Sequence, residues 1–260
     1  MKITLLQQDI CWAMPTENIR RTEVSLLNAP VSDLYVLPEM WSTGFGSPQS
    51  LTESGFDYGS DMSLQWMKTM SIRLDAAIAG SLSVRERDGI YRNRFYFVTP
   101  DDVWYYDKRH LFSYGNEHLA YTAGKERIVV EWRGVRFLLQ ICYDLRFPCF
   151  SRNWIIRSDE PLPSYGYDCA LYVASWPTSR ISVWHALLRA RALENQCYVV
   201  GVNRIGEDPQ CTYCGGTCAI DAYGRTVASC PEGTIASCSF EMDLEGLARF
   251  RRKFPVLEDV

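Results

Sequence analysis

The stretch LLQICYDLRFP, residues 138–148, changes character at a single cysteine. An apolar run leads up to Cys142, and the positions that follow it include Tyr143, Asp144 and Arg146. An apolar run that ends in a polar turn is typical of a buried strand whose carboxyl end reaches the edge of a sheet. In α/β proteins this edge is where ligands bind. The stretch therefore predicts a strand that holds a thiol at the border between the core and a charged turn.

Similar runs, rich in Val, Ile, Tyr and Phe and bounded by turn residues, recur along the chain and predict a protein with many strands. Several are nearly continuous apolar runs, as in strands that are buried on both faces. The predicted strands cover residues 2–8, 32–38, 76–84, 94–99, 103–107, 127–132, 135–142, 169–175, 197–203, 218–223, 225–230 and 234–243.

Helical patterns lie between some of these strands. They predict helices over 15–28, 62–74, 148–157, 183–196 and 244–253. Asp61 and Ser182 are the expected N-caps of the second and fourth helices. Paired strands mixed with strand–helix alternation indicate an α/β protein with layered sheets and outer helices. No linker-like segment interrupts the pattern, so we expect a single domain over residues 1–260.

Composition and charge narrow the class of protein. The 260 residues are 47% hydrophobic and 22% charged, as in ordinary globular proteins, and the net charge is −4. Lys and Arg are scattered, which argues against a nucleic-acid partner. No apolar run approaches the ~20 residues of a membrane helix, and the start MKITLLQQDI is too polar for a signal peptide. We expect a cytoplasmic protein whose ten cysteines are reduced thiols, most of them buried.

A reactive thiol requires a base or a cation nearby, because the thiolate is the nucleophile. The chain has three histidines, His110, His118 and His185. His185 lies within a helical pattern, where a structural role is expected, and no local signature supports a Cys–His protease.

Two other predicted strands end in the same way as the cysteine strand. SDLYVLPEM ends an apolar run with Pro38 and then Glu39, and VWYYDKRHLF ends one with Asp107 and then Lys108. Each residue alone is most often a solvated turn residue. Together with Cys142 they supply a set for acyl transfer: a nucleophile, a carboxylate that moves its proton, and an ammonium that stabilises the thiolate and the oxyanion.

The motifs VLPEM, YDKRHLF and ICYDLRFP, in this order and spacing, resemble the Glu–Lys–Cys triad of the nitrilase superfamily of carbon–nitrogen hydrolases. The resemblance covers nearly the whole chain, including SWP and WHALLRARALENQCYVVGVNRIG, and FPVLED resembles the C-terminal end of one branch. Within the superfamily the chain is most similar to ω-amidases of the bacterial type. The resemblance implies a four-layer α-β-β-α sandwich and a homodimer, without a metal or an organic cofactor.

Carried over to this sequence, the resemblance implies that Glu39 is the general base, Lys108 the cation beside the tetrahedral intermediate and Cys142 the nucleophile. A second glutamate follows the lysine in the family, and Glu117 in SYGNEHLAY matches it. Glu117 would orient Lys108 or the substrate amide, although a surface-loop acid is the alternative. The backbone N–H of Tyr143 would be a second oxyanion donor, as its place after a strand-end nucleophile also suggests.

The other charged residues near these motifs are expected to be structural. Asp144 and Arg146 can hold the turn after the nucleophile through ion pairs or backbone hydrogen bonds. Arg189, Arg191 and Glu194 carry both signs of charge within helical reach of one another, and so predict a packing and charge network.

The ω-amidase resemblance implies a small-molecule amide substrate, a monoamide of a dicarboxylic acid such as 2-oxoglutaramate or 2-oxosuccinamate. Its carboxylate would need a cationic or hydrogen-bonding anchor. The candidate substrate-binding residues near the family's pocket are Trp41, Phe45, Tyr114, Trp176 and Arg180.

Three alternatives stay open at the level of sequence. CTYCGGTC places cysteines at 211, 214 and 218, which would fit a metal-binding or redox protein, although no second ligand pair completes a zinc site. The chain could instead belong to another branch of the superfamily, such as a nitrilase, a carbamoyl-amino-acid hydrolase or an aliphatic amidase. A relative without catalytic activity, serving as an interaction module, is disfavoured by the complete triad.

Overall fold

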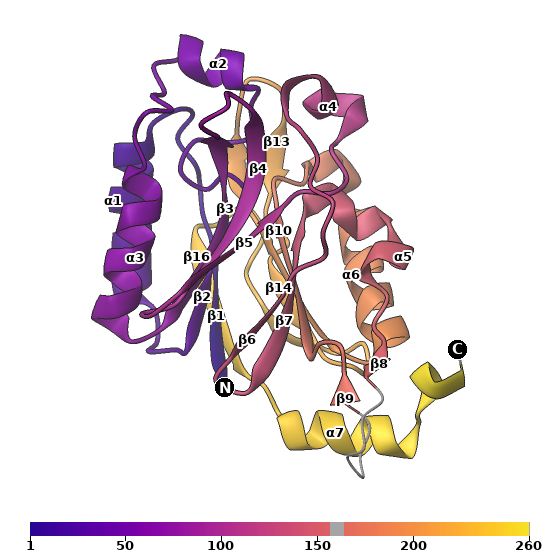
Figure 1. The fold of residues 1–260 in the computed structure, drawn as a ribbon. Coiled ribbons are helices and arrows are strands. Elements are labelled where there is room, and N and C mark those ends of the chain that lie inside the picture. The colour runs from indigo at the N-terminus through magenta and orange to yellow at the C-terminus, as the bar shows by residue number, and fades with distance from the viewer. Residues whose placement is uncertain (157–163, 260) are drawn as a thin grey trace.

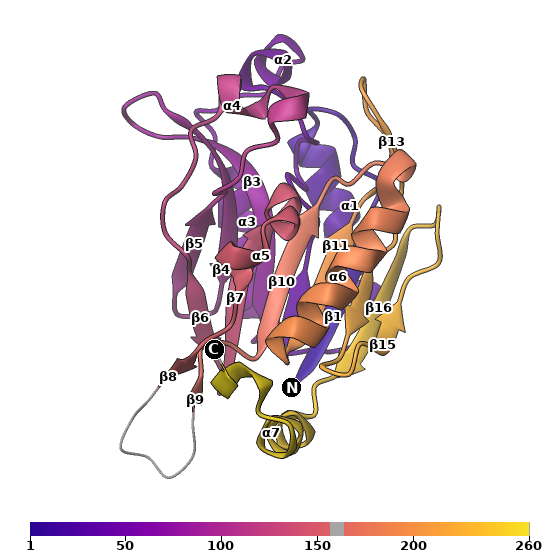
Figure 2. The same ribbon diagram turned by 90° about the vertical axis from the view of Figure 1, so that its right-hand side faces the viewer.

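The computed structural model describes residues 1–156 and 164–259 (Figures 1 and 2). Its helices are α1 (Pro15–Asn28), α2 (Pro48–Glu53), α3 (Met62–Leu74), α4 (Glu117–Ala120), α5 (Pro148–Ser151), α6 (Ile181–Asn195) and α7 (Leu244–Lys253). Its strands are β1 (Lys2–Gln7), β2 (Leu34–Val36), β3 (Ala77–Arg85), β4 (Tyr91–Val98), β5 (Val103–Asp107), β6 (Val129–Trp132), β7 (Val135–Ile141), β8 (Ile155–Ile156), β9 (Ser164–Tyr165), β10 (Cys169–Ala174), β11 (Tyr198–Asn203), β12 (Ile205–Glu207), β13 (Thr212–Cys214), β14 (Cys218–Ile220), β15 (Thr226–Ser229) and β16 (Ala236–Glu241).

Most of the strands form two six-stranded sheets. The first has the order β16-β1-β2-β3-β4-β5 and the second the order β15-β14-β11-β10-β7-β6. The neighbours β1, β2 and β3 are parallel in the first sheet, as are β7, β10 and β11 in the second, while the outer strands pair antiparallel. Parallel central strands place several carboxyl ends at one edge of each sheet, where loops can carry side chains for chemistry.

The two sheets pack face to face and share one core. Side chains from both sheets, among them Ile3, Phe95, Phe137 and Leu171, form a single buried cluster between them. The outer face of the first sheet packs against α1 and α3, and the outer face of the second packs against α6. This arrangement is the four-layer α-β-β-α sandwich of the nitrilase type that the motifs predicted.

Most of the predicted elements are confirmed, and the exceptions lie near the ends of helices. The helix expected over 148–157 is wrong: α5 ends at Ser151, and β8 begins four residues later, although residue 157 itself lies outside the described residues. The side chain of Asn153 ends this helix. Its Nδ2 donates to the carbonyls of Tyr167 and Asn195, and its Oδ1 accepts the N–H of Trp154. A polar side chain that satisfies neighbouring backbone in this way favours a turn over helix.

The two predicted N-caps do not cap their helices. Ser182 lies inside α6, because this helix continues without a break from a short 3₁₀ turn that ends at Arg180. Asp61 occupies the N-cap position of α3, but its carboxylate accepts a hydrogen bond from the Gln65 side chain (2.8 Å) and caps no backbone N–H.

All ten cysteines lie in the described part of the chain, and each is a free thiol. None of the helices in the described ranges is long and apolar enough to cross a membrane.

Candidate active site

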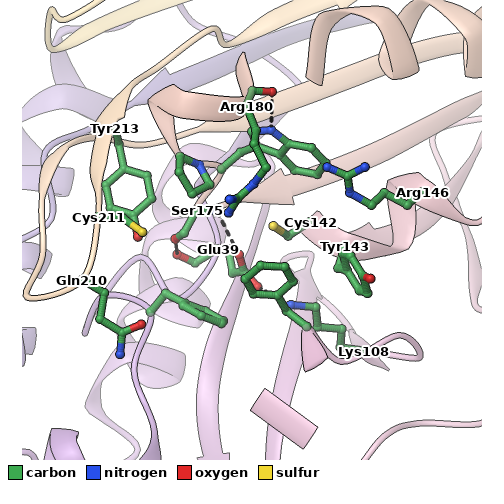
Figure 3. Close-up of a pocket in the computed structure, with 14 residues that line it drawn as sticks. Glu39, Lys108, Cys142, Tyr143, Arg146, Ser175, Arg180, Gln210, Cys211 and Tyr213 are labelled. Atoms are coloured by element: carbon green, nitrogen blue, oxygen red, sulfur yellow. Dashed lines mark hydrogen bonds and ion pairs between the residues drawn. The ribbon is translucent and has the colours of Figure 1, made fainter. Parts of the chain in front are cut away.

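Three loops that follow β2, β5 and β7 bring Glu39, Lys108 and Cys142 to the same end of the sandwich (Figure 3). The first two loops come from one sheet and the third from the other, so the site lies where the two sheets meet. The side chains of Glu39 and Lys108 have no exposed surface. The carboxylate, the ammonium and the thiol predicted from three separate strand ends therefore line one pocket.

The ammonium of Lys108 lies between two carboxylates. Its Nζ donates to Oε1 of Glu39 at 2.8 Å, and to Oε1 and Oε2 of Glu117 at 3.1 and 2.9 Å. Oε2 of Glu117 also accepts the backbone N–H of Phe112 at 2.6 Å. Glu117 is thus a buried partner of Lys108 and not an acid on a surface loop.

Glu39 is held on both of its oxygens. Oε1 accepts from Lys108 and from Nδ2 of Asn93 at 2.7 Å, and Oε2 accepts from the backbone N–H of Ser175 at 2.8 Å. Oε1 is occupied by two donors, whereas Oε2 has one donor and a lone pair available for the thiol proton of Cys142.

The pKa values of the buried groups follow from burial and from their neighbours' charges. Burial acts to lower the pKa of Lys108, but the charges of Glu117 and Glu39 outweigh it and raise that pKa, so the ammonium is permanently charged. Burial and the charge of Glu39 raise the pKa of Cys142 well above its usual range, against the opposing charge of Lys108. The raised pKa favours the protonated thiol, so a base close to the sulfur would assist its attack. Burial also raises the pKa of Glu117, and Lys108 opposes this rise.

Cys142 lies at a strained position that the following turn stabilises. Cys142 has φ = 44°, a left-handed conformation that non-glycine residues rarely adopt, and begins the 3₁₀ turn Cys142–Arg146. Such strain persists where surrounding contacts fix the backbone. Tyr143 is the second residue of this turn, where a backbone N–H has no partner within the helical turn and is free to bond a ligand.

The contacts that fix the turn come from Asp144 and Arg191. The buried carboxylate of Asp144 accepts from the N–H of Ile141, the hydroxyl of Tyr106 and both the N–H and Nδ1 of His110. Arg191 of α6 donates to the carbonyl of Leu145 at 2.6 Å and pairs with Glu194 at 2.9 Å. Asp144 and the Arg191–Glu194 pair have the structural roles that the sequence predicted.

The thiol faces a pocket of about 490 Å³, open mouth included. Its lining is largely aromatic and carries two guanidinium groups. Arg146 lies over the ring of Trp176 at 5.0 Å, and Arg180 lies over the ring of Phe112 at 5.5 Å. The other lining residues are Glu39, Phe45, Lys108, Cys142, Tyr143, Ser175, Pro177, Gln210, Cys211 and Tyr213.

Three of the five predicted substrate-binding residues line this pocket: Phe45, Trp176 and Arg180. Trp41 does not, because its side chain is fully buried in the core beside Trp66, behind the sheet. Tyr114 does not either, because it is 84% exposed on the short turn before α4.

Sequence reasoning missed several residues in or beside the pocket. Arg146 was expected to act in the turn, yet its guanidinium borders the pocket. Gln210, Cys211 and Tyr213 reach the pocket from the β12–β13 hairpin, and nothing in the local sequence indicated that this hairpin folds over the site. Asn93, which touches both carboxylates, lies on β4 one residue before the strand that the sequence predicted.

The cysteine-rich segment does not act as a unit. Cys218 packs in the core against α6, whereas Cys211 lines the pocket. Within residues 1–156 and 164–259, no group of three or more His, Cys, Asp or Glu side chains is arranged to hold a metal ion.

A protonated thiol beside a carboxylate and a buried ammonium, at the end of a four-layer sandwich, defines a class of enzyme. The model of the carbon–nitrogen hydrolase family matches residues 2–252, and the chain belongs to this family. It is a cysteine-dependent carbon–nitrogen hydrolase of the nitrilase superfamily.

Within this family, the chain is similar to several known amidases. The chain is 43% identical to the omega-amidase YafV of Yersinia enterocolitica, over 100% of this chain and 96% of the relative. It is 34% identical to the 2-oxoglutaramate amidase of Bacillus subtilis, over 99% and 96% of the two chains. Among solved structures, it resembles XC1258 from Xanthomonas campestris, a CN-hydrolase superfamily protein with an arsenic adduct in the active site (TM-score 0.91, 38% identity, 100% and 97% coverage).

Proposed function

We propose that the protein is an ω-amidase, which hydrolyses the terminal amide of a small dicarboxylic monoamide such as 2-oxoglutaramate or 2-oxosuccinamate to the acid and ammonia. The observation that carries the proposal is one pocket that holds both the Glu39–Lys108–Cys142 set and two guanidinium groups. The likeness to an omega-amidase and a 2-oxoglutaramate amidase over essentially full length supports the same substrate class.

The buried set supports a thioester mechanism. Cys142 attacks the amide carbonyl while Oε2 of Glu39 takes the thiol proton, which the raised pKa of Cys142 requires. The ammonium of Lys108 and the N–H of Tyr143 stabilise the oxyanion. Glu39 then returns the proton to the leaving ammonia. It next removes a proton from the water that cleaves the thioester and returns it to the thiolate. Glu117 keeps Lys108 in place through two short contacts.

The two guanidinium groups suit a substrate with a carboxylate. Neither Arg146 nor Arg180 forms an ion pair with Asp or Glu in the part of the chain that the structure describes, although both line the pocket. An unneutralised guanidinium beside a cavity favours an anionic ligand, and its planar fork matches a carboxylate. The aromatic rings that these guanidinium groups stack on would offer an apolar surface to the short chain between the carboxylate and the amide.

Ammonia release tests the proposal. The panel is 2-oxoglutaramate, 2-oxosuccinamate, glutamine, asparagine, an N-carbamoyl amino acid and a simple nitrile. Cys142→Ala is the inactive variant, and Cys149→Ala, which removes an exposed thiol of α5, is the matched control. We expect release from the two oxo-amides, retained by Cys149→Ala and abolished by Cys142→Ala.

Other outcomes would change the proposal in defined ways. Release from the carbamoyl compound or the nitrile alone would assign the chain to another branch of the superfamily. An active Cys142→Ala variant would refute the thioester mechanism itself. The family resemblance further implies a homodimer, and light scattering of the purified protein would measure the oligomeric state.

A further inference from the structure

The side chain of Asn93 makes contacts in the site that the catalytic set itself does not explain. It lies on β4, on the same face as Phe95 and Phe97, and only 1% of its surface is exposed. Its neighbours along this face fill the core between the two sheets. A buried amide in an apolar layer is unfavourable unless its polar atoms have partners, so its contacts must account for its presence.

Its amide nitrogen bridges the two carboxylates of the site. Nδ2 donates to Oε1 of Glu39 at 2.7 Å and to Oε1 of Glu117 at 3.0 Å. Both neighbours are acceptors, which fixes the orientation of the amide, because a flipped amide would place Oδ1 against two carboxylate oxygens. The orientation leaves Oδ1 buried, without a hydrogen-bond partner among the described residues. The arrangement thus favours the two carboxylate contacts at the cost of one unsatisfied oxygen.

We propose that Asn93 is a positioning residue that holds Glu39 and Glu117 apart, stabilises their charged forms, and leaves Oε2 of Glu39 as the oxygen that accepts the thiol proton. The inference rests on the roles given to Glu39 and Cys142 in the proposed function. Asn93 does not line the pocket, and it acts on the reaction through Glu39.

The geometry separates this role from an ordinary structural one. The backbone carbonyl of Asn93 accepts the N–H of Lys108 at 3.0 Å, and β4 pairs with β3 and β5 through its backbone. Substitution of the side chain keeps these backbone contacts. The substitution removes only the two hydrogen bonds that Nδ2 donates to the carboxylates. One of these bonds goes to Oε1 of Glu39, which also accepts from Lys108.

Two variants remove these bonds in different ways. Asn93→Ala leaves a small cavity, and Asn93→Asp keeps the shape but places a third carboxylate beside the other two. Both make the charged forms of the carboxylates less favourable, and Asn93→Asp does so more strongly. Asn153→Ala is the control, because Asn153 is an equally buried asparagine that bonds only backbone and another asparagine, outside the pocket.

The first measurement is the pH dependence of amide hydrolysis. The acid limb of kcat/KM should move to higher pH by about 1 unit in Asn93→Ala and further in Asn93→Asp, which corresponds to the loss of one charge-assisted hydrogen bond. We expect kcat to fall about 10- to 100-fold, with KM changed less than threefold because Asn93 does not touch substrate. Asn153→Ala should lower the melting temperature but leave the pH profile in place.

The second measurement needs no substrate. The rate at which iodoacetamide alkylates Cys142, followed by mass spectrometry of its peptide, depends on pH through the same carboxylates. We expect its midpoint to move to higher pH in the order wild type, Asn93→Ala, Asn93→Asp. If the wild type hydrolyses nothing in the panel, this shift still supports the role of Asn93 while the proposed substrate class fails. An unshifted alkylation profile in folded Asn93→Ala overturns the inference, whatever the substrate is.

Discussion

Replacing Lys108 by methionine tests whether its ammonium holds two buried carboxylates in their charged forms. Lys108→Met keeps the apolar stem but removes a group that donates to Glu39 once and to Glu117 twice, at 2.8 to 3.1 Å. Removing one partner of a buried ion pair costs about 3–5 kcal/mol, because the other charge is left without a partner. A protein of marginal stability should show this loss clearly.

The loss of stability should depend on pH, and its sign follows from the pKa shifts. The pKa of Lys108 is raised above its usual value of 10.5, so the stability it contributes is fully present below that value and constant between pH 5 and 8. In the variant, burial and the charge of Glu39 raise the pKa of Glu117 without the opposing charge of Lys108, and only the N–H of Phe112 and the amide of Asn93 still favour the carboxylate. The folded variant then binds a proton that the unfolded chain has released. Its free energy of unfolding therefore falls by about 1.4 kcal/mol per pH unit as the pH rises from the pKa of Glu117 in the unfolded chain to that in the folded variant.

The assay is urea unfolding followed by tryptophan fluorescence at several pH values, with linear extrapolation. We expect the free energy of unfolding of Lys108→Met to lie below that of the wild type by about 1 kcal/mol or less at pH 5. This difference should grow to about 3–5 kcal/mol at pH 8. Lys125→Met, at an exposed lysine, is the control and should change the free energy by less than about 0.5 kcal/mol. A small deficit at pH 8, or one that is the same at every pH, would refute the reasoning that the ammonium neutralises buried carboxylates.

Three further outcomes test other parts of the site. Arg180→Met should raise KM for 2-oxoglutaramate about tenfold or more and change hydrolysis of an uncharged amide little, and steady-state kinetics on both substrates will decide. Arg191→Met should lower the free energy of unfolding by about 1–3 kcal/mol, since it leaves the buried carbonyl of Leu145 without its donor; an unchanged urea midpoint would contradict this. Glu39→Gln should abolish hydrolysis, because no carboxylate then takes the proton of the Cys142 thiol as it attacks; hydrolysis at the wild-type rate would show that Glu39 is not the base.

The predictions from sequence held where a single local rule determines the outcome. Apolar runs bounded by turn residues located the strands of both sheets. The change from apolar to polar sequence at three strand ends pointed to Glu39, Lys108 and Cys142. β2 and β5 end at one edge of the first sheet and β7 ends beside it in the second sheet, so three weak signals combined into one site. The predictions failed where tertiary contacts override local preference, as at Asn153, whose bonds to two distant carbonyls end a helix that the sequence favours.

The sequence by itself indicated an α/β protein with layered sheets and placed Glu39, Lys108 and Cys142 at strand ends, because strand periodicity and strand ends are written in consecutive residues. The roles expected for these three residues came from the resemblance of their motifs to the nitrilase superfamily. Only the tertiary structure decided which aromatic residues line the pocket, since Trp41 and Phe45 look alike in sequence but lie in the core and in the cavity. It also decided that Arg146 borders the pocket and that Asn93 bridges two carboxylates. These contacts join residues from different strands and from both sheets. Their distances depend on how the sheets pack, which no local pattern specifies.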